Sequence, residues 1–439
     1  MSEVVHGKRG PIAILQEFSI PLIAGVLAAV AWANLDHHSY HDIMHWSPFG
    51  HESHFNFHFL MNDLFMALFF GIAAKEITES CLPGGALNPP KKAINPLLGT
   101  IGGVVGPVGV YFLIVAMTGD SSIRNGWGIP TATDIALAWL VARMIFGKGH
   151  PAVSFLLLLA VADDGLGLGI IAIFYPDPHH PVNPAWLGLV GAGMAAAYGM
   201  RRAKVHSFWP YLIAGGALSW CGLYFAHLHP ALALVPIIPF MPSRGHDDGL
   251  FAEGESEAHH DTLNNFEHSF KLPVDLGLFG FGLANAGVEF SSMGNATVAV
   301  LLALAIGKTG GIFMFSWIGH KLGFPLPAGM GWRSLMTAGC VAGLGLTVAL
   351  FVAGVAFTEP GLQGAAKMGA LLSAFIAPIA MFMGRALGVR QEFERLSREE
   401  TTIIEDLDIA YETPADEVPA DEYEQPQVAS GEEEQTPLQ

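Results

Sequence analysis

Charged residues are scarce in this chain, and no stretch alternates apolar and polar residues over a useful length. Asp, Glu, Lys and Arg make up 14% of the 439 residues, whereas 51% are hydrophobic. Soluble proteins average about 25% charged residues, and a membrane barrel needs alternating strands of about ten residues. The composition therefore argues against an ordinary soluble protein, and the missing alternation argues against a membrane β-barrel.

Cysteine is rare, and basic residues are absent from the end of the chain. Cys81, Cys221 and Cys340 are widely spaced, which indicates neither a disulfide framework nor a zinc cluster. After Arg398 come fourteen acidic residues and no basic one, so this tail carries most of the net charge of −18 and leaves −4 for the rest. We predict that residues 389–439 form an acidic, disordered cytoplasmic tail. We expect no nucleic-acid partner.

Long apolar runs are abundant. They come in blocks of about 18 to 25 residues, enough for a helix to cross a hydrocarbon core of about 30 Å. We therefore predict an all-α integral membrane protein, with residues 1–11 as a cytoplasmic N-terminus and residues 12–388 as a transmembrane domain. The twelve expected spans are 12–34, 59–80, 94–118, 127–146, 151–175, 184–200, 208–226, 229–242, 272–290, 295–319, 333–357 and 363–386.

The basic residues predict an orientation. If the N-terminus is cytoplasmic, seventeen of the 21 Lys and Arg residues fall on the cytoplasmic side, and only Arg124 and Lys367 fall on the other. This is the positive-inside pattern, and it favours an even number of spans with both termini in the cytoplasm. The outer loop 35–58 then holds seven histidines, which suggests a solvated loop or, less simply, metal binding or pH sensing. The inner loop 243–268 is a charged linker.

Four charged residues lie in apolar segments, where placing a charge in the membrane interior costs free energy. Asp163 and Asp164 are adjacent within residues 152–174, and Asp134 and Lys308 lie in two other spans. Insertion scales put each such residue at about 2.5 to 3.5 kcal/mol at a bilayer centre. They must therefore face each other, water or an ion, which makes them the candidate functional site.

Two of the predicted spans contain residues that interrupt helices. Residues 128–134 combine Gly128 and Pro130 with two threonines, and residues 339–347 hold three glycines in seven positions. Proline removes a helical donor and clashes with the preceding turn. Interrupted helices at corresponding positions of two halves mark the midplane site of many transporters. We therefore expect spans four and eleven to be broken at the site.

The candidate site is built from oxygen atoms. Asp163, Asp164, Asp134 and Thr133 offer hard donors without His or Cys in their segments, which suits a small monovalent cation such as Na⁺, or a proton. A carboxylate that holds a proton cannot hold the cation as well, and this competition is a basis for exchange. Neighbouring helical residues point about 100° apart, so one Asp could bind the ion while the other pairs with Lys308. Lys308 is then either a counter-charge or a proton carrier.

Four stretches resemble the NhaA family of Na⁺/H⁺ antiporters: residues 126–136, 162–165, 281–288 and 306–308. The resemblance covers residues 12 to 388. It implies a twelve-helix bundle of inverted repeats with two interrupted, crossing helices. It also implies electrogenic exchange of cytoplasmic Na⁺ or Li⁺ for external protons at the bacterial inner membrane, for sodium and pH homeostasis, without a cofactor or enzymatic activity.

The resemblance assigns roles to individual residues. Asp164 would be the main Na⁺ ligand with Asp163 and Thr133 as further ligands and Asp134 close by, and Lys308 would pair with Asp163. The pH-response candidates would be Glu76, Glu267, His268 and His229, although His229 also suits a helix end. The outer loop 35–58 would form a β-hairpin that joins two protomers. Gly165 and Trp139 depart from the usual family residues, which leaves ion preference and pH range open.

Other functions stay open on the sequence. A sodium-coupled symporter of an organic anion could use a related fold. A channel is a further alternative, although Lys308 in the path would hinder conduction. An intramembrane aspartyl protease needs two opposed Asp residues, usually with a Gly-x-Gly-Asp motif; the motif is absent, but Asp134 and Asp164 could still oppose each other.

Overall fold

The computed structural model describes residues 20–48, 55–83, 90–147, 149–176, 180–243 and 261–396. It contains two compact units, Met1–Phe393 and Glu394–Gln439, and of the second only residues 394–396 are described, as helix. Every regular element among the described residues is helical, without a strand. The predictions for residues 1–11 and for the tail beyond residue 396 lie outside the described part.

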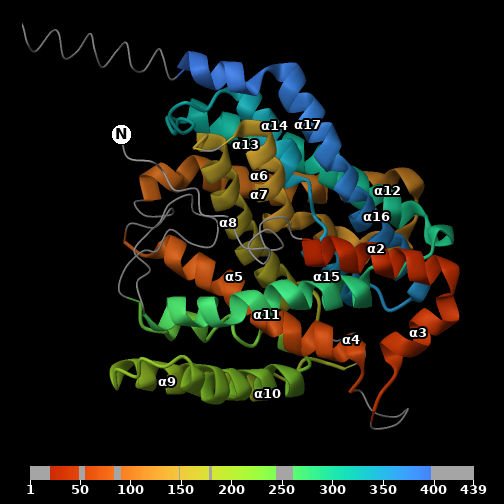
Figure 1. Ribbon diagram of the computed structural model, residues 1–439, viewed down its shortest axis with the longest axis vertical. Coiled ribbons are helices and arrows are strands. Elements are labelled where there is room, and N and C mark those ends of the chain that lie inside the picture. The colour runs from red at the N-terminus through yellow and green to blue at the C-terminus, as the bar shows by residue number, and fades with distance from the viewer. Residues whose placement is uncertain are drawn as a thin grey trace, which may run out of the picture. The chain divides into compact units, whose positions relative to one another are not determined.

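Figure 1 shows the described helices, coloured from red to blue along the chain. In the labels, η marks a 3₁₀- or π-helical stretch. In chain order they are α2 (Ile20–Leu35), α3 (His37–His45), α4 (Phe57–Phe59), η1 (Leu60–Phe65), α5 (Met66–Cys81), α6 (Pro90–Thr118), η2 (Ser121–Thr131), α7 (Ile135–Phe146), α8 (Pro151–Phe174), η3 (Pro184–Trp186), α9 (Leu187–Arg202), η4 (Tyr211–Gly216), α10 (Ala217–Phe225), η5 (Pro230–Leu232), η6 (Ile238–Phe240), α11 (Thr262–Asn285), η7 (Phe290–Ser292), α12 (Asn295–Leu302), η8 (Ala303–Lys308), α13 (Thr309–Lys321), α14 (Trp332–Ala342), α15 (Thr347–Ala356), α16 (Pro360–Leu372), η9 (Ser373–Phe375) and α17 (Ile376–Leu387).

The described residues contain five helices long and apolar enough to cross a membrane, and up to seven if each bent pair is counted as one span. The five are Phe57–Cys81, Ala93–Thr118, Pro151–Phe174, Asn295–Lys321 and Pro360–Leu387. The bent pairs are η2 with α7, at 59°, and α14 with α15, at 48°. The predicted breaks in spans four and eleven are thus confirmed.

Four sequence-based expectations need correction. Disorder was predicted from residue 389 onward, but residues 389–396 are helical. Residues 229–242 form no regular α-helix but short 3₁₀ stretches and turns, because Pro230, Pro236 and Pro239 each remove a backbone donor. The inner loop is shorter than 243–268, because α11 already begins at Thr262. In the outer loop, the described residues form helix α3 rather than a β-hairpin; residues 49–54 lie outside the described part.

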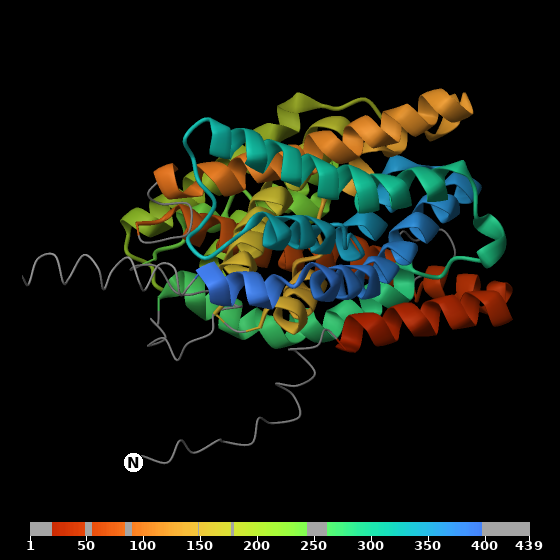
Figure 2. The ribbon, with the colours of Figure 1, turned by 90° about the horizontal axis from the view of Figure 1, so that it is seen from above.

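Helix α6 lies directly against the helix that carries Lys308 (Figure 2). Gly102 and Gly106 of α6 face Gly311 and Gly307, so that a Cβ atom added at Gly102 would lie 2.2 Å from the carbonyl oxygen of Gly311, and one at Gly106 would lie 2.2 Å from that of Gly307. Small residues four apart on both helices permit this approach. The glycine contact therefore sets the depth at which Lys308 enters the bundle.

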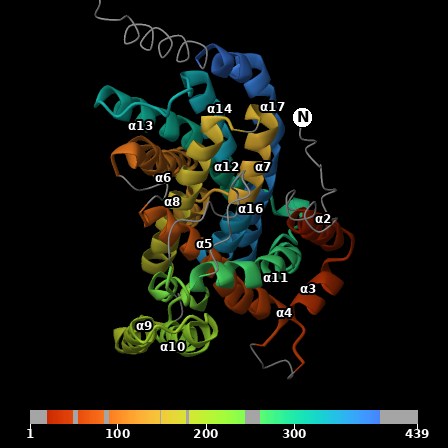
Figure 3. The ribbon, with the colours of Figure 1, turned by 60° about the vertical axis from the view of Figure 1, so that its left-hand side comes forward.

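The remaining helices surround the contact between α6 and the helix that carries Lys308. Helix α8, with the two adjacent carboxylates, packs against α5, α6, α7 and α14. Helices α9 and α10 pack on each other and form a pair at one edge of the first unit, whereas α14 and α17 lie at the opposite edge (Figure 3). The centre of the bundle thus lies where α6, α8 and the two bent pairs meet.

Candidate functional site

The two broken helices are joined by hydrogen bonds at their breaks. The backbone N–H of Asp134, between η2 and α7, donates to the carbonyl oxygen of Leu344, between α14 and α15, at 2.6 Å. The hydroxyl of Thr133 donates to the carbonyl oxygen of Ala342 at 3.0 Å. Both breaks leave backbone groups without helical partners, and each break satisfies groups of the other.

The Asp134 side chain holds the starts of two helices. Its Oδ1 accepts the N–H of Leu137 in the first turn of α7 at 3.0 Å, and its Oδ2 accepts the N–H of Thr347, the first residue of α15, at 3.2 Å. Helix N-termini carry a partial positive charge and free N–H groups, both of which favour a carboxylate. Both oxygens of this buried side chain are therefore used for capping, a role that the sequence did not reveal.

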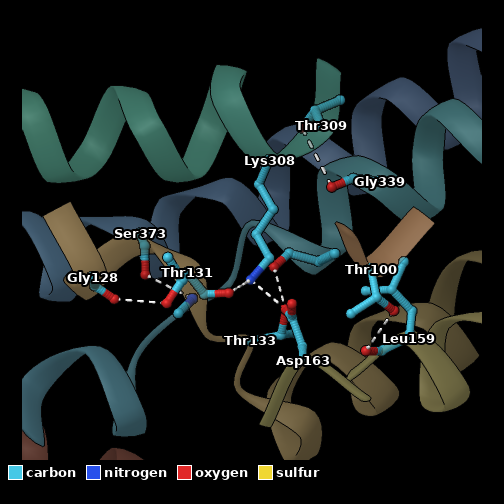
Figure 4. A network of polar contacts seen from close by, with 12 residues as sticks. Thr100, Gly128, Thr131, Thr133, Leu159, Asp163, Lys308, Thr309, Gly339 and Ser373 are labelled. Carbon is cyan, nitrogen blue, oxygen red and sulfur yellow. Dashed lines mark hydrogen bonds and ion pairs between the residues drawn. The ribbon is translucent and has the colours of Figure 1, made fainter. Parts of the chain in front are cut away.

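Asp163 and Lys308 form an ion pair in the interior. The Lys308 Nζ lies 2.5 Å from Asp163 Oδ2, and both side chains are 0% exposed. The same Asp163 oxygen accepts the hydroxyl of Thr133 at 2.8 Å, and Lys308 also donates to the carbonyl oxygen of Thr131 at 2.6 Å. Figure 4 shows Lys308 reaching down between Thr131 and Asp163, with Thr133 on the other side of the carboxylate. The structure thus brings residues of three predicted spans, the fourth, fifth and tenth, into contact at one ion pair.

Two carboxylate oxygens remain without a partner. Oδ1 of Asp163 and Oδ1 of Asp164 are buried and accept no hydrogen bond from the described residues. The Asp163 oxygen faces Gly103 of α6, where an added Cβ would lie 3.7 Å away. A buried polar atom without a partner costs free energy, so each such atom in a native structure requires an explanation. A bound ion or proton at these two oxygens would be the missing partner.

The two adjacent Asp residues differ in their surroundings. Asp163 is fully buried and paired with Lys308, whereas Asp164 is 7% exposed and makes no ion pair among the described residues. Because successive helical positions diverge by about 100°, Asp164 does not share the direction in which Asp163 meets Lys308. Asp164 is therefore the more accessible of the two.

A second buried ion cluster surrounds Lys75. Its Nζ lies 2.7 Å from Glu79 and 3.5 Å from Glu76, and it makes its shortest ion pair with Glu267 of α11. Lys75 is 0% exposed and Glu79 2%. The predicted residues Glu76 and Glu267 thus meet at one lysine, which the sequence analysis did not single out. The apolar run of residues 64–74 that ends directly at Lys75 was the available signal.

The two predicted histidines lie elsewhere. His268 follows Glu267 on α11 but is exposed, because adjacent helical side chains point apart. His229 precedes η5, where its Nδ1 accepts the N–H of Ala231 at 3.3 Å and its ring meets Phe351 edge-on at 4.7 Å. His229 therefore serves as a helix cap.

Similarity to known proteins agrees with this architecture. A family model for Na⁺/H⁺ antiporter 1 matches residues 15–384. The Na⁺/H⁺ antiporter NhaA of Geobacter metallireducens is 61% identical over 384 residues, covering 87% of this chain and 99% of the relative. Na⁺/H⁺ antiporter NhaA 1 of Pelobacter propionicus is 60% identical over 379 residues (86% and 98%), and the NhaA of a Jannaschia species is 46% identical over 414 residues (85% and 97%). The chain belongs to the Na⁺/H⁺ antiporter 1 family.

Proposed function

We propose that this protein exchanges cytoplasmic Na⁺ or Li⁺ for external protons across the bacterial inner membrane. The observation that carries the proposal is the pair of buried oxygens on Asp163 and Asp164 that have no hydrogen-bond partner among the described residues. They lie beside two broken helices whose breaks are hydrogen-bonded to each other. The relatives at about 60% identity are named Na⁺/H⁺ antiporters. The protein is accordingly a transporter rather than an enzyme, and it needs no cofactor beyond its transported ions and surrounding lipid.

Asp164 is the main ion ligand in this proposal. It is 7% exposed, whereas Asp163 is fully buried, and it makes no ion pair among the described residues. Its carboxylate oxygens suit a small hard cation. Thr133 and Asp163 support it from the buried side. A carboxylate that takes up a proton loses most of its attraction for Na⁺, so proton and ion compete for the same oxygen. Arrival of one therefore drives release of the other.

The Asp163–Lys308 pair couples to this exchange. A cation that approaches the free oxygen of Asp163 competes electrostatically with the ammonium group on the other oxygen, 2.5 Å away. Ion binding therefore weakens the hold of Lys308 on its proton, and Lys308 can act as a carrier as well as a counter-charge. If both Asp164 and this pair release protons, more than one proton moves per sodium ion and the exchange is electrogenic.

The Lys75 cluster supports a role in pH response. Three glutamates share one lysine there, so at least one negative charge exceeds what Lys75 alone can balance. Glu76 and Glu267 belong to this cluster, whereas His268 and His229 do not share it. We therefore place pH regulation on the glutamates.

Further details remain proposals. We propose that the protein has twelve spans in inverted repeats and that both termini lie in the cytoplasm, as the basic residues predict. We also propose a homodimer that forms through the outer loop 35–58. The helical form of α3 means that a dimer contact there would use helix rather than strand.

The alternative functions have less support. Neither matched relatives nor the site indicates an organic substrate for a symporter. A channel would have to conduct ions past the fully buried Asp163–Lys308 ion pair. For an aspartyl protease, Asp134 would have to act as a catalytic acid, but both its oxygens cap helices.

The test uses a pH-sensitive dye in inverted vesicles that carry the protein. Addition of Na⁺ or Li⁺ should dequench the dye, and K⁺ provides the control for ion preference. Asp164→Asn should abolish the response, whereas Asp42→Asn, on the exposed face of α3, should preserve it. A full response from the Asp164→Asn protein would overturn the site assignment. Absence of proton release when Na⁺ is added to purified protein would overturn the competition mechanism.

A further inference from the structure

A short segment after α17 contacts the far ends of both broken helices. Helices α7 and α14 run from the breaks to the predicted cytoplasmic side, and we call them the inner half-helices. Gly388 has a left-handed backbone, with φ of 65°, that ends α17 and turns the chain. Residues 389–393 then continue as a helical turn beside both inner half-helices. We call these five residues the clamp segment.

Arg390 binds the end of α7. Its Nε donates to the carbonyl oxygen of Ile145 and its Nη2 to that of Met144, both at 3.0 Å. These carbonyls belong to the last turn of the helix, where intrahelical donors are lacking and the helix dipole is negative. One guanidinium thus supplies two hydrogen bonds and a positive charge to this helix end.

Glu392 binds the start of α14. Its Oε2 accepts the N–H of Ser334 at 3.0 Å and the Ser334 hydroxyl at 2.8 Å, and its Oε1 accepts the N–H of Arg333 at 3.4 Å. The N-cap position of α14 is Gly331, which has no side chain to do this. A Cβ added at Gly331 would lie 2.3 Å from the Glu392 carboxylate. The glycine therefore leaves room for a cap that comes from a distant part of the chain.

Two more contacts extend this arrangement. Arg333 of α14 donates through Nη1 to the carbonyl oxygen of Leu387 at the end of α17, at 3.3 Å. The Phe393 ring lies 4.5 Å from the ring of His150, which caps α8 and also contacts Phe146 at the end of α7. The helices that carry Asp134 and the Asp163–Asp164 doublet, together with α14, therefore meet at the clamp segment.

We propose that Arg390 and Glu392 are positioning residues for ion exchange. The inner half-helices are joined to each other at the breaks, through Asp134 and Leu344, and at their far ends through the clamp segment. With both ends held, the half-helices keep Thr133 against Asp163. Loss of the clamp-segment contacts lets the half-helices tilt about the breaks. This movement lowers the affinity of the site for Na⁺. This inference depends on the proposed exchange activity.

The experiment measures the apparent KM for Na⁺ and its pH profile in inverted vesicles. Arg390→Ala and Glu392→Ala should each raise the apparent KM by about 2- to 30-fold, the range found for coupling between distant residues. The double variant should raise it no more than the larger single effect, because both residues act through one segment. The exposed neighbours Arg385 and Glu394 provide matched controls, since Arg385→Ala and Glu394→Ala should leave the KM unchanged.

One further variant separates positioning from simple helix capping. Gly331→Ser in the Glu392→Ala background gives α14 its own N-cap, and the space vacated by Glu392 accommodates the new side chain. This protein should regain resistance to denaturant but keep the raised KM. If this protein regained both the resistance to denaturant and the original KM, Glu392 would act only as a helix cap, and the proposal would be overturned. An unchanged KM in folded Arg390→Ala and Glu392→Ala proteins would overturn it as well.

The outcomes distinguish the two proposals. If the unaltered protein gives no response to Na⁺, the proposed exchange fails. If it responds and the clamp variants match it in KM and pH profile, only the clamp inference fails. Where alanine variants do not fold, Arg390→Lys and Glu392→Gln serve instead, because lysine keeps the charge but loses the planar two-donor geometry. They should give smaller KM increases in the same direction.

Discussion

Neutralising one member of the Asp163–Lys308 pair should destabilise the protein more than neutralising both. In Asp163→Asn, the ammonium group of Lys308 stays fully buried and keeps only the carbonyl oxygen of Thr131 and an amide as partners. At 2.5 Å and an effective dielectric constant of about 20, the lost attraction is about 7 kcal/mol before compensation. Removal of one partner from buried pairs costs about 3 to 5 kcal/mol net, and we expect a loss in that range.

The double variant tests this reasoning. Asp163→Asn with Lys308→Gln leaves no buried charge, and the two amides can bond to each other and to Thr133. Its stability should exceed that of either single variant, with a coupling free energy of up to about 3 kcal/mol. Asp164→Asn is the matched control, because that carboxylate has no ion pair among the described residues and its unpartnered oxygen contributes no stability. It should unfold at the same denaturant concentration as the original protein or at a higher one.

The assay is equilibrium unfolding of purified protein in detergent without Na⁺, followed by the fluorescence of its nine tryptophans. Transport is measured in parallel and should be lost in Asp164→Asn despite its stability. Additive losses in the double variant would show that the two groups do not interact, and would refute the ion pair. A destabilised Asp164→Asn protein would show that its carboxylate has a structural partner after all.

Three further predictions concern the scaffold. Gly106→Leu should push α6 away from Gly307, lowering protein yield and reducing stability by about 1 to 3 kcal/mol or more. Gly109→Ala is the control and should be tolerated, because an added Cβ there meets no atom within 4 Å. Equal losses of stability in a thermal melt of the two variants would contradict the close helix contact. Asp134→Ala should lower the free energy of unfolding by about 1 to 4 kcal/mol, since each of the two lost helix caps contributes about 0.5 to 2 kcal/mol. Unfolding in denaturant measures this loss. A loss smaller than that of one cap would argue against the double capping role. Burial lowers the pKa of His150 from 6.5 to about 4, so the unfolded chain binds a proton that the folded protein does not. Its contribution to stability is therefore full above pH about 6.5 and is lost as the pH falls toward about 4; His150→Gln should flatten the pH dependence of unfolding over that window, and an unchanged slope would refute the assignment.

The sequence alone predicted the class of the protein and singled out the buried charges that the structure brings together. Long apolar runs and a few charges within them are local properties, and the cost of placing a charge in hydrocarbon makes Asp163, Asp164 and Lys308 conspicuous without any structure. Proline and glycine in spans four and eleven also act locally, so the two breaks could be predicted. Residues 229–242 were predicted as a span from their apolar composition, although the prolines in that segment remove helical donors and leave short 3₁₀ turns.

What only the tertiary structure decided is which polar groups satisfy one another. Asp134 reads as an ion ligand in the sequence, but the start of α15, at Thr347, comes from more than 200 residues away to occupy its second oxygen. Glu267 likewise finds Lys75 across the chain, and Glu392 supplies the cap that Gly331 lacks. Such pairings depend on how closely backbones approach, which the glycines of α6 and α13 determine through steric contact between helices. Hydropathy and periodicity describe one segment at a time, so they identify the charges that must be compensated but not the partners that compensate them.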